Sequence, residues 1–162
     1  MKICLLSCLL SGLGALSTLA QKTSLPPTPT PTVPESAAGA PVKHVTAQEA
    51  AKALSEAEVA AIKSPEKAIS VIDVRTPAEF AGGHIKGAQN VDIASPDFQK
   101  DLAKLDPTKT YLVHCAAGGR STRSLGVLNK LGFKSIMHLD GGLNTWKEAG
   151  LPLEKSPPAK QP

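Results

Sequence analysis

The chain has 162 residues, enough for one domain with a substantial hydrophobic core. It carries 18 Lys and Arg against 14 Asp and Glu, and the scattered positive residues form no block that would indicate a nucleic-acid-binding surface. With one Trp, one Tyr and three Phe, the chain must have a largely aliphatic core, and an aromatic-lined ligand pocket is not expected.

The amino terminus has the pattern of a secretory signal peptide. Met1-Lys2 is a short positive start, residues 3–16 are apolar, and Thr18-Leu19-Ala20 is a small-x-small cleavage signal. The apolar stretch is too short, and too interrupted by Gly and Ser, for a membrane span. A lipoprotein signal ending at Cys8 would leave too little apolar chain ahead of that cysteine. We therefore predict a signal peptide over residues 1–20 and a periplasmic or secreted protein.

Two Pro-rich segments flank the predicted domain. Residues 21–41 are rich in Pro, Thr, Ser and Ala and are expected to form a disordered linker, and residues 156–162 are expected to form a disordered tail. The folded domain is predicted over residues 42–155. Because the other two cysteines lie in the predicted signal peptide, Cys115 is the single cysteine of the mature chain, and no internal disulfide is expected.

The first half of the predicted domain starts with a short strand over residues 42–45. Thr46-Ala-Gln-Glu49 follows it and has the pattern of a helix capping box. The β-branched run over residues 68–74 predicts a buried strand. Thr76-Pro77-x-Glu79 predicts a second helix start, with Pro at the first helical position.

The second half continues the alternation of strands and helices. A strand is predicted over residues 88–92, followed by a helix that begins near Ser95-Pro96. The remaining predicted elements are a central strand at 111–113, a helix from about 120 to 131, a strand at 135–139 and a helix at 143–149. This alternation predicts an α/β three-layer sandwich with a mainly parallel sheet.

Cys115 directly follows the central predicted strand. Small residues and then an arginine come after it: Ala116, Ala117, Gly118, Gly119 and Arg120. A tight turn leading into a helix exposes unpaired N–H groups, which bind anions. These groups, together with the guanidinium groups of Arg75, Arg120 and Arg123, would lower the pKa of the Cys115 thiol. We predict a reactive Cys115, with a buried, inert cysteine as the alternative.

Three stretches of the sequence together resemble the single-domain rhodaneses, a family of sulfurtransferases: residues 73–91, 115–121 and 139–152. The resemblance implies a rhodanese-like sandwich of about five strands flanked by helices. It implies that Cys115 takes sulfur from a donor such as thiosulfate, forms a persulfide and passes the sulfur to cyanide or a thiol. It also implies that the loop N–H groups from Ala116 to Arg120 bind the anionic sulfur, that Arg75 and Arg120 contribute to substrate binding, and that no cofactor is required.

Two other functions compete with this interpretation. A rhodanese-like domain can serve as a persulfide carrier or protein-interaction module with little turnover of small molecules. A Cys-dependent phosphatase or arsenate reductase would place the arginine six positions after the cysteine, whereas Arg120 lies five positions after Cys115. The expected partners are a small anionic sulfur donor, a thiol or cyanide acceptor and possibly a protein acceptor. No nucleic acid is expected, and no stable membrane span after signal cleavage.

Four histidines and a single mature cysteine show no paired metal-binding spacing, so no metal site is expected. His84 and His114 are expected to be structural. Trp146 is expected in the core.

Overall fold

The computed structural model describes residues 41–155. The predicted signal peptide, the predicted linker up to residue 40 and the predicted tail at 156–162 lie outside the described residues. Within residues 41–155, no helix combines the length and the apolar character needed to cross a membrane.

Five parallel strands form one sheet in the order β1-β5-β4-β2-β3. They are β1 (Val42–Val45), β2 (Ile69–Asp73), β3 (Ala88–Asn90), β4 (Thr110–His114) and β5 (Ser135–Leu139). Strands inside a parallel sheet are buried on both faces, which fits the burial of consecutive residues at the ends of β2 and β4. The predicted α/β sandwich with a five-stranded parallel sheet is confirmed.

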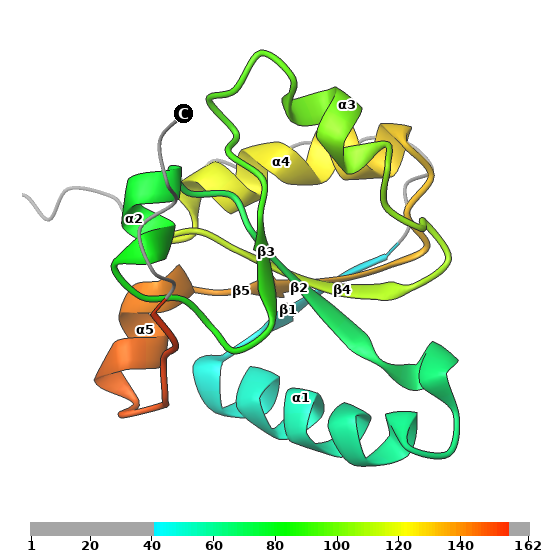
Figure 1. Ribbon diagram of the computed structural model, residues 1–162, viewed down its shortest axis with the longest axis vertical. Coiled ribbons are helices and arrows are strands. Elements are labelled where there is room, and N and C mark those ends of the chain that lie inside the picture. The colour runs from blue at the N-terminus through cyan, green and yellow to red at the C-terminus, as the bar shows by residue number, and fades with distance from the viewer. Residues whose placement is uncertain (1–40, 156–162) are drawn as a thin grey trace, which may run out of the picture. The chain divides into compact units, whose positions relative to one another are not determined.

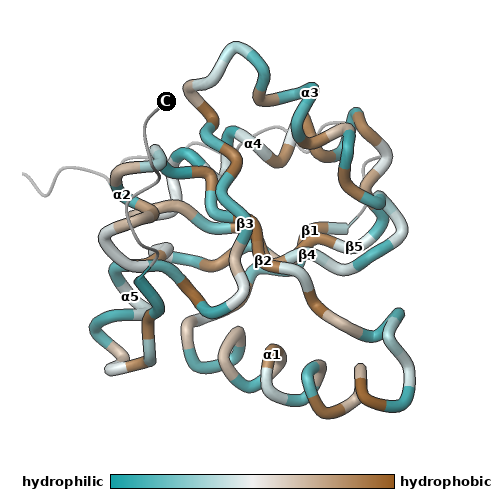
Figure 2. Tube along the Cα trace, in the orientation of Figure 1, coloured by the Kyte–Doolittle hydropathy of each residue, from teal (hydrophilic) through white to brown (hydrophobic). Residues whose placement is uncertain are grey.

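Helices cover both faces of this sheet (Figure 1). They are α1 (Ala47–Ala61) and α5 (Gly142–Glu148) on one face, with α3 (Phe98–Leu102) and α4 (Gly119–Lys130) on the other. The short helix α2 (Pro77–Ala81) follows β2, and a 3₁₀ turn, η1 (Pro65–Lys67), precedes it. Figure 2 shows hydrophobic residues along the strands between these layers.

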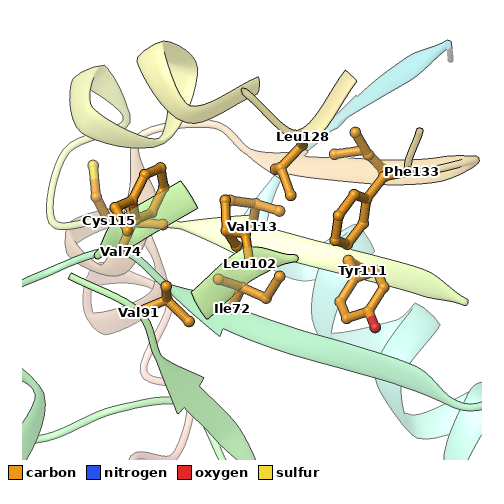
Figure 3. Packing of buried hydrophobic residues seen from close by; sticks show 11 residues of the cluster. Ile72, Val74, Val91, Leu102, Tyr111, Val113, Cys115, Leu128 and Phe133 are labelled. Carbon is orange, nitrogen blue, oxygen red and sulfur yellow. The ribbon is translucent and has the colours of Figure 1, made fainter. Parts of the chain in front are cut away.

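Two hydrophobic clusters fill the space between the sheet and the helices. Because side chains alternate along a strand, Ile72 and Val113 point toward α3 and α4, where they pack with Leu128 (Figure 3). Their chain neighbours Val71 and Leu112 point to the other face and pack with α1 and α5. Trp146 on α5 is 4% exposed and belongs to this second cluster, which confirms its predicted place in the core.

The predicted capping box at Thr46 is present, and the helix start predicted at Thr76 also has a capping box. The Thr46 and Thr76 hydroxyl groups accept hydrogen bonds from the N–H groups of Glu49 and Glu79, whose carboxylates accept from the threonine N–H groups in return. The helix α3 begins at Phe98, later than the Ser95-Pro96 start that the sequence predicts. The Phe98 N–H donates to the Ser95 carbonyl at 3.1 Å, so this segment forms a turn before the helix.

Asp73 and Arg75 form a buried ion pair at the carboxyl end of β2. Their side chains are 0% and 5% exposed, and Nε of Arg75 lies 2.9 Å from each carboxylate oxygen of Asp73. A terminal nitrogen of Arg75 also donates to Asp73, at 2.6 Å, and to the Gly83 carbonyl, at 2.8 Å. The pair therefore ties the end of β2 to the segment after α2.

The start of α5 is fixed to the chain that follows β4. The N–H groups of Leu143 and Asn144 donate to the carbonyls of Cys115 and Ala116 at 2.8 and 2.9 Å. Gly142 has φ +60°, and a Cβ at this position would lie 2.5 Å from the Cys115 carbonyl oxygen. Only glycine combines this conformation with so close an approach.

We predict that Gly142→Ala lowers the free energy of unfolding by roughly 2–4 kcal/mol, because it adds both backbone strain and a collision with backbone atoms. Urea denaturation measures the change. Gly126→Ala is the matched control, since Gly126 is an exposed residue inside α4 with no atom within 4 Å of a new Cβ. It should raise stability by about 0.5–1 kcal/mol. Equal effects of the two variants would contradict the prediction.

We also predict that Arg75→Ala lowers the free energy of unfolding by about 3–5 kcal/mol, because it leaves the Asp73 carboxylate buried without its partner. The exposed pair between Lys86 and Glu58 supplies the control. Lys86→Ala should cost less than about 1 kcal/mol. A loss for Arg75→Ala as small as that of the control would show that the buried pair does not stabilise the fold.

Candidate active site

Cys115 lies at the carboxyl end of β4, next to β2, and the connections that follow these two strands run to opposite sides. The chain leaves β4 through α4 to β5, whereas it leaves β2 through α2 to β3, on the opposite side of β2. In an open parallel sheet this divergence creates a crevice at the carboxyl ends of the two strands. Figure 3 shows Cys115 at the end of β4, beside the first turn of α4.

The chain after Cys115 curls so that its donors face the sulfur. Gly118 has φ +95°, and its N–H donates to Cys115 Sγ at 3.1 Å. The Ser121 hydroxyl lies 3.6 Å from the same sulfur. The loop therefore surrounds the thiol with groups that stabilise a negative charge.

Two opposing effects act on the pKa of the Cys115 thiol. Burial is the largest single influence and raises the pKa. Hydrogen bonds from the backbone and side chain of Ser121, and from the backbone N–H groups of Ala117 and Arg120, together lower it further than burial raises it. The net result is a pKa below the ordinary value of a thiol, which increases the thiolate fraction at neutral pH.

A cavity of about 380 Å³ adjoins the thiol. It is lined by Cys115, Ala116, Ala117, Gly119, Arg120 and Arg123. Gly118 contributes its N–H to the sulfur and does not line this cavity. Arg123, which the sequence suggested only as a neighbouring charge, is part of the lining.

Arg75 lies away from the cavity beside Cys115. The sequence predicted that it helps to bind substrate, but its guanidinium is buried against Asp73 and Gly83 and does not line the cavity beside Cys115. A buried carboxylate attracts the guanidinium more strongly than a solvent-facing site could, because water does not screen the buried pair. Arg75 stabilises the end of β2.

Arg120 forms a two-pronged ion pair with Glu79. Its terminal nitrogens lie 2.7 Å from the two carboxylate oxygens, and both side chains are partly exposed. The hydrogen bond from Arg120 is the main reason that the pKa of Glu79 falls to about 2. In return, hydrogen bonding to Glu79 raises the pKa of Arg120. The pair joins the Cys115 loop to α2, across the crevice.

A row of polar side chains leads from the Cys115 sulfur toward the edge of the sheet formed by β5 and β1. Ser121 is fully buried, and its hydroxyl lies 2.9 Å from Nε2 of His138 on β5. Nδ1 of His138 lies 3.0 Å from Oδ1 of Asp140. Neither His138 nor Asp140 was expected near Cys115: His138 lies in no motif, Asp140 lies in the 139–152 stretch without an assigned role, and strand pairing brings both behind Ser121.

The two histidines predicted to be structural, His84 and His114, pack inside the fold away from the cavity. His84 stacks on Phe80 with ring centroids 3.8 Å apart, and its Nδ1 lies 3.0 Å from the Phe80 carbonyl. His114 is fully buried, and this burial is the main cause that lowers its pKa. Neither residue lines the cavity beside Cys115.

Comparison with curated protein sequences gives relatives that include a sulfurtransferase and an uncharacterized protein. The thiosulfate sulfurtransferase GlpE of Stutzerimonas stutzeri is 36% identical over 78 residues, which cover 48% of this chain and 69% of GlpE. An uncharacterized protein of Synechocystis is 36% identical over 98 residues, or 56% of this chain. The match covers 50% of the Synechocystis protein, so the chain spans only about half the length of that relative.

Comparison with solved structures gives the same fold. A rhodanese-related protein from Thermoplasma volcanium superimposes with a TM-score of 0.56 and 28% identity, over 70% of this chain and 99% of that protein. The sequence profile of the family described as "Rhodanese-like domain" matches residues 46–149. This segment contains the Cys115 loop and four of the five strands. The chain belongs to the rhodanese-like family.

Proposed function

We propose that the protein is a sulfurtransferase that carries sulfane sulfur on Cys115. The observation that supports this most directly is the surrounding of Sγ: a thiol with a lowered pKa, facing the Gly118 N–H and the Ser121 hydroxyl beside a small cavity. The sulfurtransferase name of the GlpE relative agrees with this chemistry.

The reaction has two balanced steps. In the first, the Cys115 thiolate attacks the outer sulfur of thiosulfate. A new S–S bond forms, the bond to the sulfonate sulfur breaks, and sulfite leaves with its electron pair. In the second, cyanide or a thiolate attacks the outer sulfur of the persulfide, takes that sulfur and regenerates the Cys115 thiolate. Sulfur moves between nucleophiles in both steps, so the chain's own cysteine serves as the carrier.

The loop supports both steps electrostatically. The outer sulfur of a persulfide is anionic and extends from Sγ toward the cavity lined by Ala116, Ala117 and Gly119. Backbone N–H groups at a helix start stabilise such a charge without reorganising. At the rim, Arg120 balances the charge of the Glu79 carboxylate, and the charge of Arg123 favours an anionic donor.

We also propose that the protein is exported to the periplasm or secreted. The positive start, apolar stretch and cleavage signal in residues 1–20 support this location. With one cysteine left after cleavage, the persulfide has no second thiol in its own chain, so an external acceptor must take the sulfur.

We predict that incubation with thiosulfate adds the mass of one sulfur atom to the protein at Cys115 and releases one equivalent of sulfite. Intact-mass spectrometry and a sulfite assay measure the two products. Cys115→Ser is the control and should show neither product. If the parent protein gains no sulfur relative to this control, sulfur transfer is not its function. Sulfur gain without transfer to cyanide or small thiols would instead indicate a carrier that serves a protein acceptor.

We predict that Arg120→Ala slows reaction with thiosulfate about ten-fold more than it slows alkylation of Cys115 by neutral iodoacetamide. The reason is that the change removes a positive charge and leaves the Glu79 carboxylate unbalanced beside the loop. Stopped-flow rates with the two reagents give the ratio.

The double variant Arg120→Ala/Glu79→Gln tests this explanation, because it removes both charges. It should recover much of the lost preference for thiosulfate. If both reagents slow equally in Arg120→Ala, then Arg120 acts by holding the shape of the loop and not by its charge.

A further inference from the structure

Two histidines and an aspartate meet at the edge of the sheet formed by β1 and β5. His44 and His138 are register partners on these parallel strands, so their side chains project from the same face. The Asp140 N–H donates to the Val45 carbonyl at 2.9 Å, which extends the pairing of β1 with β5 to the residue that carries the carboxylate. Nδ1 of His44 and Nδ1 of His138 lie 2.8 and 3.0 Å from the same oxygen, Oδ1 of Asp140.

We propose that His44, His138 and Asp140 bind a divalent transition-metal ion of the zinc class. Their ligand atoms all lie within 4.8 Å of one another. Tetrahedral zinc with bonds of about 2.0–2.2 Å separates its ligand atoms by about 3.3 Å, so the ion needs only small side-chain rotations to fit. None of these three residues lines the cavity beside Cys115.

The surroundings of the three residues suit coordination. The side chains of His44 and Asp140 are 56% and 52% exposed, so they can rotate, and water can fill the remaining position on the ion. The side chain of His138 is 4% exposed and is held in one orientation by the fold. The site thus combines one rigid ligand with two adjustable ones.

His138 also has the outer partner that metal-binding histidines normally require. When Nδ1 binds an ion, the ring proton resides on Nε2. Here Nε2 lies 2.9 Å from the Ser121 hydroxyl oxygen and 3.4 Å from the Thr122 hydroxyl oxygen, either of which can accept that proton's hydrogen bond. A hydrogen bond of this kind fixes the tautomer and orients the imidazole toward the ion.

The ligand types select the class of ion. Two imidazoles and one carboxylate favour Zn²⁺ and its neighbours in the transition series, whereas Mg²⁺ and Ca²⁺ prefer oxygen ligands alone. An ion at this place would link the edge strand β1 to β5 through side chains. Since only the folded state assembles the three ligands, binding should also raise the melting temperature.

The test uses the full chain with Cys4→Ser, Cys8→Ser and Cys115→Ser, so that no thiol competes for the ion. Titration calorimetry with Zn²⁺ should show one ion bound per chain, and Mg²⁺ should not bind. Co²⁺ should give the visible absorption of a four-coordinate ion. In this background, His44→Ala and Asp140→Asn should each weaken Zn²⁺ binding at least about ten-fold, since loss of even an outer partner costs 10–100-fold.

Lys43→Ala is the matched control, because Lys43 is an exposed neighbour of His44 that offers no ligand in this cluster. It should bind Zn²⁺ as the parent does. Zn²⁺ should raise the melting temperature of the parent and of Lys43→Ala, but not that of His44→Ala, whose altered side chain is mostly exposed and leaves the core intact. Absence of saturable Zn²⁺ binding, or equal binding by the parent and His44→Ala, would overturn the proposal.

Discussion

The geometry around Cys115 depends on the contact between the start of α5 and the loop that follows β4. Two N–H groups of α5 hold the carbonyls of Cys115 and Ala116, so the carbonyls of the loop point toward α5 while the Gly118 N–H points at the sulfur. This contact requires Gly142, because any Cβ there would collide with the loop backbone. Backbone groups that are buried without hydrogen-bond partners destabilise a fold, and a tight loop around an anion leaves several of its backbone groups unpaired within the loop. The helix start offsets that cost by satisfying the carbonyls.

Arg75 and Arg120 have different roles because their burial differs. Arg75 is buried and is paired with Asp73, so it holds together the end of β2 and the segment after α2. Arg120 is partly exposed, and its pair with Glu79 joins the Cys115 loop to α2. Glu79 also belongs to the capping box of α2, so one carboxylate both starts this helix and positions the loop. The two sides of the crevice are thereby fixed relative to each other.

The polar groups behind the thiol extend across the sheet. Ser121 lies between Cys115 and His138, and Asp140 then lies between His138 and His44. Ser121 and His138 are buried polar groups, which must be paired, and each finds a partner on a different element. The row connects the crevice at the centre of the sheet with the edge strand β1.

Most of the local structure, and the Cys115 loop as the candidate site, could be predicted from the sequence. Strand runs, capping boxes and the small residues after Cys115 depend on a few chain neighbours, so they can be recognised without the fold. The start of α3 was misplaced because a turn at Ser95 precedes the helix. The partners of most charged and polar side chains depend on the tertiary structure. Folding joined Arg120 to Glu79, brought His44 beside His138, and buried the short-range pair of Asp73 and Arg75. Strand order and register, set by burial of the whole sheet, decide which residues far apart in the chain become neighbours, and no spacing within the chain encodes them.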